Sequence, residues 1–371
     1  MRRFTGNPVC GTTLKQQYLV VIEAASQLAR ANAWDNRPPR TPRPTCADPP
    51  KARRSTTARD SAPTKAADAR IERYRHAEGA LWSHYGLEPK ERFVDLDSPA
   101  VRLRLQEVGS GQPILFIHGG VWPGTAFASL VRELSGFRCL MLDRPGCGLS
   151  SALDYARHPY KSVIAQAMIG VLDDLGIDRA HVVGQEVGAA WTLALATAHP
   201  NRVERVVLTG AAPLLREQPV PTFLRVLASP IGALIVRLPQ SRGQARSILR
   251  QDGHGPSVEA GRIPDPYLDW HVALMRETKT MRNERALIRA TLGRGGWRPE
   301  VTFDADELAQ VQQPVLYVYG TGDPESTVDR VKHLVGMLPR ADLHLIDGGG
   351  HMPWLDDPSH VGARIGSFLS A

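Results

Sequence analysis

Three ionisable side chains stand in glycine-rich segments of this 371-residue sequence. Glu186 lies in Gly184-Gln-Glu-Val-Gly188, Asp323 follows Gly320-Thr-Gly322, and His351 follows three consecutive glycines. Carboxylate and imidazole groups can attack carbon or move protons once they are held in a pocket. Glycine allows the backbone to turn sharply and to approach its neighbours closely. Two carboxylates and a histidine in such settings therefore indicate acid–base or covalent chemistry.

Each of these segments follows a short apolar run of the kind that forms a buried strand. The expected strands are Val101–Val108, Ile114–Ile117, Cys139–Leu142, His181–Val183, Val203–Leu208, Val315–Tyr319 and Leu343–Ile346. Helical patterns over 160–176 and 189–198 separate several of them, and one over 361–369 closes the chain. This alternation predicts an α/β fold, with a mostly parallel central sheet flanked by helices. Ligands bind at the carboxyl ends of strands in such sheets, which is where Glu186, Asp323 and His351 fall.

The order of the segments resembles the α/β-hydrolase superfamily of the AB hydrolase-1 type. His118-Gly-Gly120 takes the place of the oxyanion loop, Gly184–Gly188 that of the nucleophile elbow, and Asp323 and His351 follow as acid and base. Asp143–Ser150 is similar to the turn after an early strand of that family. The resemblance implies an α/β-hydrolase domain over residues 76–371. After the strand expected at 203–208, strands and helices stop alternating. This indicates a helical lid at about 213–299.

The elbow departs from the family at its central position. The family usually places Ser there, whereas this sequence has Glu186. A carboxylate that attacked an ester would form a mixed anhydride, but one that attacks the sp³ carbon of an epoxide or alkyl halide forms an ester that water can cleave. Epoxide hydrolases and haloalkane dehalogenases of the superfamily use Asp in this way. Their usual companions are absent, because Val187 replaces their Trp and Val121 replaces their Pro.

The resemblance implies a role for each residue of the site. Glu186 is nucleophile or general base, His351 activates water or shuttles a proton, and Asp323 orients His351. The N–H groups of Gly120 and Val187 form the oxyanion hole. We therefore expect a hydrolase of a small apolar organic substrate, with epoxide-hydrolase-like chemistry favoured over a plain esterase and with no metal or organic cofactor. Two alternatives stay open: a lyase, isomerase or cyclase that uses Glu186 as a base, and a degenerate ligand-binding protein.

Four further residues near these segments allow either a structural or a functional interpretation. Trp122, directly after the oxyanion loop, is the candidate for lining the substrate pocket. His118, Asp143 and Cys147 are interpreted as structural, because histidines beside loops and short side chains in turns more often bond the local backbone.

The N-terminal part differs in composition from the rest. Residues 1–75 hold 15 of the 45 Lys and Arg but only 6 of the 38 Asp and Glu, so the basic charge is concentrated there. Seven prolines among residues 36–63 predict disorder, and apolar spacing predicts one helix over 13–33. The body shows no basic footprint for nucleic acid and no apolar run that could cross a membrane. The four cysteines have no metal-binding spacing, and we expect a cytoplasmic protein.

Overall fold

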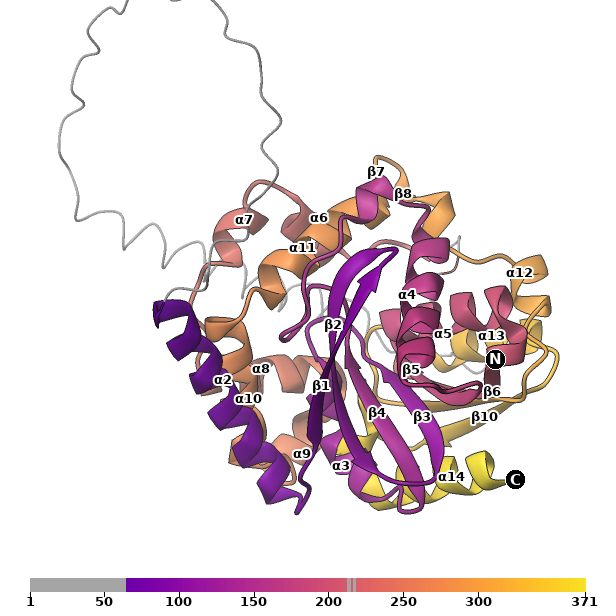
Figure 1. Ribbon diagram of the computed structural model, residues 1–371, viewed down its shortest axis with the longest axis horizontal. Helices are drawn as coiled ribbons and strands as arrows, with labels where there is room; N and C mark the ends of the chain where they lie inside the picture. Colours follow the sequence, from indigo (N-terminus) through magenta and orange to yellow (C-terminus); the bar gives the residue numbers. More distant parts are fainter. Residues whose placement is uncertain (1–64, 212–214, 216–217) are drawn as a thin grey trace, which may run out of the picture. The chain divides into compact units, whose positions relative to one another are not determined.

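The computed structural model describes residues 65–211, 215 and 218–371, and residues 70–371 form one compact unit (Figure 1). An eight-stranded sheet runs through this unit in the order β1-β2-β4-β3-β5-β6-β9-β10. Strand β2 pairs antiparallel with β1 and with β4, and every other pair in the sheet is parallel. The strands are β1 (Lys90–Asp97), β2 (Ala100–Gly109), β3 (Gln112–Ile117), β4 (Phe137–Asp143), β5 (Ala180–Gln185), β6 (Val203–Thr209), β9 (Val315–Gly320) and β10 (Ala341–Ile346). The predicted α/β architecture is confirmed.

Alternate residues of each central strand enter two separate cores. In β3, Leu115 and Ile117 pack into one core while Ile114 and Phe116 pack into the other. Helices α4 (Tyr160–Asp174), α5 (Val187–Ala198), α12 (Ala305–Ala309) and α13 (Val328–Met337) cover the first face, and α2 (Lys65–His84), α3 (Ala128–Arg132) and α14 (Pro358–Ser370) cover the second. Burial on both faces explains why stretches such as Ile114–Ile117 of β3 are apolar at every position.

Helix α2 crosses the predicted start of the domain at residue 76. Its side chains Tyr74, Leu81 and Trp82 are buried, so the packing begins before that position, and the compact unit starts at Arg70. The predicted helix over 13–33 and the predicted disorder over 36–63 lie outside the described residues.

A helical insertion separates β6 from β9, where the sequence predicts a lid over about 213–299. It contains α6 (Thr222–Ala228), α7 (Gly232–Ile235), α8 (Arg242–Leu249), a π-helical turn (Arg250–His254), α9 (Gly255–Glu259), α10 (Asp265–Glu277) and α11 (Thr280–Thr291), followed by the short strands β7 (Leu292–Gly293) and β8 (Gly296–Trp297). Whether the insertion acts as a lid stays a prediction.

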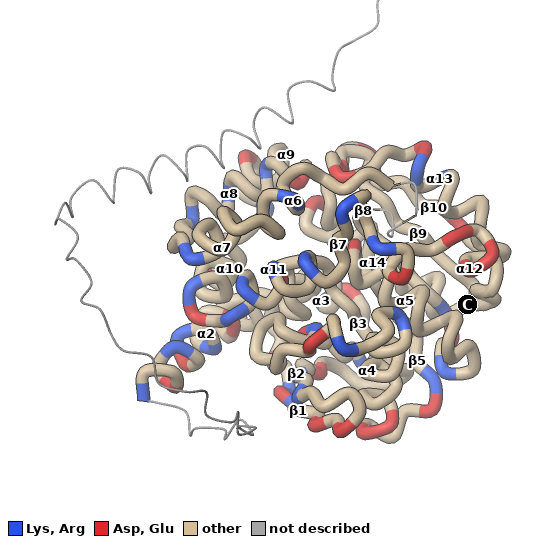
Figure 2. Tube along the Cα trace, turned by 90° about the horizontal axis from the view of Figure 1, so that it is seen from above, with Lys and Arg blue, Asp and Glu red and all other residues tan. Residues whose placement is uncertain are grey.

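Charges of both signs are mixed over the described body (Figure 2). No helix of residues 65–211 and 218–371 combines the length and the apolar character that a membrane span requires.

Candidate active site

The nucleophile elbow is the turn between β5 and α5. Its central residue, Glu186, has φ 51° and ψ −118°, and it is the one non-glycine residue with positive φ in the described part of the chain. A Cβ at Gly184 would collide with the Thr192 hydroxyl, and one at Gly188 would collide with the Ile117 carbonyl. The flanking glycines thus let β5, α5 and β3 meet closely enough to hold Glu186 in a strained conformation, which is a common feature of functional sites.

The Glu186 side chain is held by the loop after β3. The Gly120 N–H donates to Glu186 Oε2 at 2.6 Å, which leaves Oε1 as the other carboxylate oxygen. Gly120 is one of the two donors predicted for the oxyanion hole. Val187, the other, begins α5 directly after Glu186, and its role as a donor stays a prediction.

The predicted acid and base are brought together from two neighbouring loops. Asp323 follows β9 and His351 follows β10, and Asp323 Oδ2 lies 3.0 Å from His351 Nδ1. The second Asp323 oxygen, Oδ1, accepts a hydrogen bond from the Glu325 N–H at 2.9 Å. Both Asp323 and His351 are buried, so this contact is shielded from water. On the insertion side, the His351 N–H donates to the Asp252 carbonyl at 2.8 Å, which fixes the histidine loop.

An unexpected residue contacts the histidine ring. The amide of Gln185 places Nε2 at 2.8 Å from His351 Nε2, and its Oε1 accepts from the Gly119 N–H at 2.6 Å. In the sequence, Gln185 is merely a flank of the elbow with no chemistry assigned to it. The interaction spans 166 positions of the chain, so no local pattern could have indicated it.

Partly buried carboxyl groups surround the histidine. Burial raises the pKa of Glu186, and Glu284 on α11 raises it further, while His351, Arg144 and the Gly120 N–H oppose that rise. Burial likewise raises the pKa of Glu325 to about 8. His351 opposes that rise, so the protonation of Glu325 depends on the charge of the histidine.

Two more groups complete the electrostatics of the site. Burial raises the pKa of Asp252 to about 6. Burial alone lowers the pKa of His351, but the carboxylates of Asp323, Glu325 and Glu186 outweigh it and raise that pKa well above its usual value. No cluster of three or more His, Cys, Asp or Glu among the described residues is arranged to hold a metal ion.

His118 is structural, as the sequence interpretation expects. Its Nδ1 lies 2.7 Å from the Gly119 carbonyl, and its Nε2 accepts from the Arg144 N–H at 2.9 Å. The buried Arg144 guanidinium donates to the carbonyls of His118 (2.9 Å) and Gly120 (2.8 Å) and lies 3.3 Å from Glu284. Arg144 therefore connects the oxyanion loop to the helical insertion.

The two other structural candidates also support the turn after β4. Asp143 accepts hydrogen bonds from the N–H groups of Gly124 and Leu149, each at 3.2 Å, and from Arg104. Cys147 is buried, and its thiol lies 3.8 Å from the Gly120 carbonyl.

Trp122 lies beside the site and packs against the insertion. Its ring stacks on His271 of α10 with centroids 4.1 Å apart and on Tyr267 with centroids 5.8 Å apart. It is 4% exposed. Contact between Trp122 and a substrate stays a prediction.

A second histidine–carboxylate pair, His254 with Asp356, lies close to the first. His254 Nδ1 lies 2.9 Å from Asp356 Oδ2, while His254 Nε2 accepts from the Met352 N–H at 3.1 Å. The Ser257 hydroxyl donates to Asp356 and not to the histidine. Because both ring nitrogens of His254 are occupied, this pair braces the loop of His351 and has no nitrogen available as a base.

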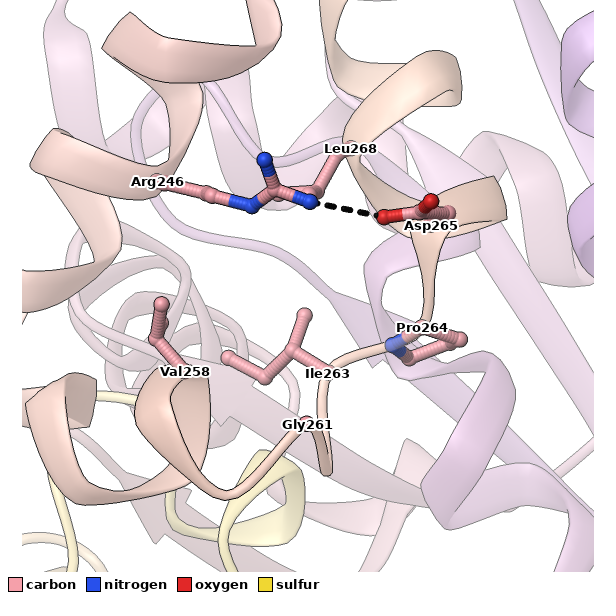
Figure 3. A pocket seen from close by; sticks show the side chains of 7 residues that line it. All are labelled: Arg246, Val258, Gly261, Ile263, Pro264, Asp265 and Leu268. Atoms are coloured by element: carbon pink, nitrogen blue, oxygen red, sulfur yellow. Dashed lines mark hydrogen bonds and ion pairs between the residues drawn. The ribbon is translucent and has the colours of Figure 1, made fainter.

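One small cavity of about 230 Å³ lies within the insertion, between α8, α9 and α10 (Figure 3). The ion pair between Arg246 and Asp265, at 2.9 Å, lies along its side. Its lining consists of Arg246, Val258, Gly261, Ile263, Pro264, Asp265 and Leu268. This set shares no residue with the candidate site, so the cavity is not where Glu186 acts.

The fold and the elbow define a class of protein. The chain belongs to the α/β-hydrolase fold family, whose model matches residues 112–358. The predicted membership of that superfamily is thus confirmed.

Individual relatives are distant but match over nearly their whole length. The chain is 24% identical to a 2-hydroxy-6-oxononadienedioate/2-hydroxy-6-oxononatrienedioate hydrolase of Pseudomonas sp over 290 residues, which cover 75% of this chain and 96% of the relative. It is 24% identical to a proline iminopeptidase of Heyndrickxia coagulans, over 76% of this chain and 99% of the relative.

Solved structures show the same fold. The naproxen esterase of Bacillus subtilis has a TM-score of 0.62 at 17% identity, over 80% of this chain and 97% of that one. The 2-hydroxy-6-oxo-6-phenylhexa-2,4-dienoate hydrolase of Rhodococcus sp. strain RHA1 has a TM-score of 0.60 at 19% identity, over 77% of this chain and 100% of that one. These proteins are named as hydrolases, and their names give no specific support to epoxide-hydrolase-like chemistry.

Proposed function

We propose that the protein hydrolyses a small, mostly apolar organic substrate, with Glu186 attacking an sp³ carbon to form an ester that water then cleaves. The observation that carries this proposal is the hydrogen bond from the Gly120 N–H to Glu186 Oε2. It leaves Oε1 as the attacking oxygen. Once Oε1 carries the substrate carbon, Oε2 is the carbonyl oxygen of the new ester and already has a donor.

That donor matters most in the second step. Water adds to the carbonyl carbon of the glutamyl ester, and negative charge develops on Oε2. A backbone N–H that is already in place stabilises this oxyanion without reorganisation, an effect worth about 10²–10³-fold in rate for a single donor. A Glu that served only to bind a ligand would have no need of a donor on one oxygen in a strained turn.

The remaining groups account for the protons. In the first step the bond from Oε1 to carbon forms and a carbon–oxygen bond of an epoxide breaks, so the leaving oxygen requires a proton. Glu325 is suited to supply it, because burial raises its pKa to about 8. In the second step His351 Nε2 takes a proton from water and returns it to the departing alkoxide, which leaves Glu186 as a carboxylic acid. Transfer of that proton to the Glu325 carboxylate restores both groups. Asp323, 3.0 Å from Nδ1, stabilises the imidazolium formed in between.

A second candidate function has its own support. Burial and Glu284 raise the pKa of Glu186, and a raised pKa suits a general base. Relatives are named as hydrolases of 2-hydroxy-6-oxo acids, so the substrate of this chain could present a carbonyl carbon in place of an sp³ carbon. In that case Glu186 deprotonates water or a carbon acid and no covalent ester forms.

Trapping of the ester separates the two functions. The protein is incubated with a panel of epoxides, alkyl halides and p-nitrophenyl esters, and turnover is measured. With any substrate that reacts, His351→Ala should accumulate a covalent adduct, because attack by a preformed carboxylate needs no base while hydrolysis of the ester does. Intact-mass spectrometry detects the added substrate mass, and peptide mapping should place it between Gly184 and Gly188.

The control is His333→Ala, which changes an exposed histidine on α13 and should leave turnover unaltered. Turnover of the parent in labelled water should also introduce label into the Glu186 carboxylate. An active parent that shows neither adduct nor label would eliminate the covalent mechanism and leave the general-base function. An inactive parent on the whole panel would favour the ligand-binding alternative.

A further inference from the structure

The orientation of the Gln185 amide is fixed by its surroundings. The Gly119 N–H can only donate, so the atom 2.6 Å from it must be the amide oxygen. The NH₂ group must therefore face His351.

This orientation determines the state of the histidine ring. An amide NH₂ group only donates, so His351 Nε2, at 2.8 Å, must accept and carry no proton. The single ring proton then resides on Nδ1, which donates to Asp323 Oδ2 at 3.0 Å. Gln185 is 1% exposed and His351 3% exposed, so bulk water does not compete for either hydrogen bond.

The carboxyl groups around the ring act in the opposite direction. Asp323 and Glu325 face it from the loop after β9, Glu186 from the elbow, and Asp252 from the π-helical turn of the insertion. Together these carboxylates favour the imidazolium form and raise the pKa of His351. A protonated His351 could not remove a proton from water, so the proposed second step needs something that keeps Nε2 free.

We infer that Gln185 is a positioning residue that keeps His351 Nε2 unprotonated and directed toward the elbow until a water molecule takes the place of its amide. Its part in catalysis rests on the proposed function, whereas the state of the ring does not. When the glutamyl ester forms, Glu186 loses its negative charge. Water then replaces the Gln185 amide as the donor to His351 Nε2, and the neutral imidazole can act as the base.

The test reads the histidine ring directly by nitrogen NMR of protein labelled in its histidines. The His351 signals are assigned by their loss in His351→Gln, and their titration is followed with pH. In the parent, Nε2 should be unprotonated at neutral pH. In Gln185→Met, which keeps a similar side-chain length but has no donor, the midpoint should rise by about one pH unit or more, a tenfold change in the protonation constant.

Two further variants make the result specific. Gln185→Glu keeps an acceptor for the Gly119 N–H and adds a negative charge next to Nε2, so it should raise the midpoint further. Gln313→Met makes the same change at another buried glutamine, whose amide donates to the Pro200 carbonyl at 3.0 Å, and should leave the midpoint unchanged.

Two results would overturn the inference: a parent in which both ring nitrogens of His351 are protonated at neutral pH, or equal midpoints in the parent and in Gln185→Met. Neither result bears on the ester-trapping experiment, so the two proposals fail separately. If a substrate is found, the acidic limb of the kcat/KM profile should move to higher pH in Gln185→Met, because activity requires the neutral ring.

Discussion

Two consecutive backbone N–H groups bind two consecutive side chains at the centre of the site. Gly119 holds Gln185 and Gly120 holds Glu186, each at 2.6 Å. In a family that usually places Ser at the elbow, backbone N–H donors at this position are available to bind an oxygen of the substrate. Here the longer carboxylate of Glu186 reaches the Gly120 donor itself. The replacement therefore does more than change the nucleophile, because it places one oxygen of the nucleophile in the position of the oxyanion.

Removal of the Glu186 charge should abolish turnover and preserve the fold. Glu186→Gln keeps an oxygen that can accept from the Gly120 N–H, but the amide is neither nucleophilic nor basic. We expect a loss of about 10³-fold or more in kcat with an unchanged melting temperature. Glu88→Gln, at an exposed position, is the control for the substitution itself. Full turnover in Glu186→Gln would show that the carboxylate is not the chemical group.

The companion variant Glu186→Ser rebuilds the usual family triad with Asp323 and His351. It should gain weak activity on p-nitrophenyl esters that the parent lacks, since a serine alkoxide can form an acyl ester that water cleaves. A Glu186→Ser protein without such activity would indicate that Gln185 still occupies His351, and the double variant with Gln185→Met should then acquire it.

Gly119→Ala should separate positioning from stability. The new Cβ would collide with the ends of the Gln185 and Glu186 side chains, which are flexible and can move aside at little cost in stability. Their displacement from the backbone donors should lower kcat by about 10²-fold, the loss typical of a misplacement of about 1 Å. The melting temperature should stay close to that of the parent. Gly79→Ala, where a Cβ has open space, is the control, and equal activity in both variants would contradict the expectation.

At the scale of elements, helix α2 is attached to the sheet through a buried polar network. Glu78 Oε1 accepts hydrogen bonds from Tyr74 (2.7 Å) and Thr125 (2.6 Å) and from Arg104 of β2 (3.1 Å). Arg104 also lies 3.2 Å from Asp143 at the end of β4. The network therefore connects α2 with the turn after β4, whose residues Arg144 and Cys147 lie against the oxyanion loop.

Glu78→Ala should destabilise the protein strongly. Loss of one partner from a buried ion pair costs about 3–5 kcal/mol, because the remaining charge stays buried. Arg104 keeps Asp143 and Glu91 as partners, so we expect about 3 kcal/mol. Urea unfolding measures the free energy. Glu72→Ala removes an exposed pair on the same helix, with Arg75 at 3.6 Å, and should cost less than about 1 kcal/mol. Equal losses in the two variants would show that the network does not anchor α2.

The sequence predicts the parts of the fold whose physical signal is local. Runs such as Ile114–Ile117 are apolar throughout because both faces of the strand are buried. The apolar pattern does not predict helix α2, because Glu78 occupies a position on its buried face. It does not predict β1 either, because only Val94 of that edge strand is buried. The juxtaposition of Asp323 with His351 follows from the topology of a parallel sheet. The contacts of Gln185 do not, since they depend on the rotamers of residues far apart in the sequence.

At the scale of the whole unit, the insertion and the body meet around the site on two sides. On one side the Asp252 carbonyl accepts from the His351 N–H at 2.8 Å. On the other, Thr280 of α11 accepts from the Gly148 N–H at 3.0 Å, and the Asn283 amide donates to the Gly146 carbonyl at 2.9 Å. Interactions that hold the insertion therefore also hold the loops that carry the chemistry, so loss of stability should extend to the site.

Two buried histidines make that stability dependent on pH. Burial lowers the pKa of His181 to about 4 and that of His271 to about 3. Among the described residues, neither ring nitrogen of either histidine has a hydrogen-bond partner. In the unfolded chain both should titrate near about 6.5. Below that pH the unfolded state binds more protons than the folded state, so the free energy of unfolding must fall as pH is lowered from about 6.5 toward the folded-state values.

His271→Phe should weaken this dependence. Each buried histidine contributes a slope of up to about 1.4 kcal/mol per pH unit between its folded and unfolded pKa values, and phenylalanine binds no proton. The aromatic ring should preserve the stack on Trp122, where the centroids are 4.1 Å apart, so stability at pH 7 should change little. Urea unfolding at a series of pH values between 7 and 5 gives the slopes. His333→Phe, at an exposed position, should keep the slope of the parent. Identical slopes in the parent and in His271→Phe would mean that His271 is not kept neutral by burial.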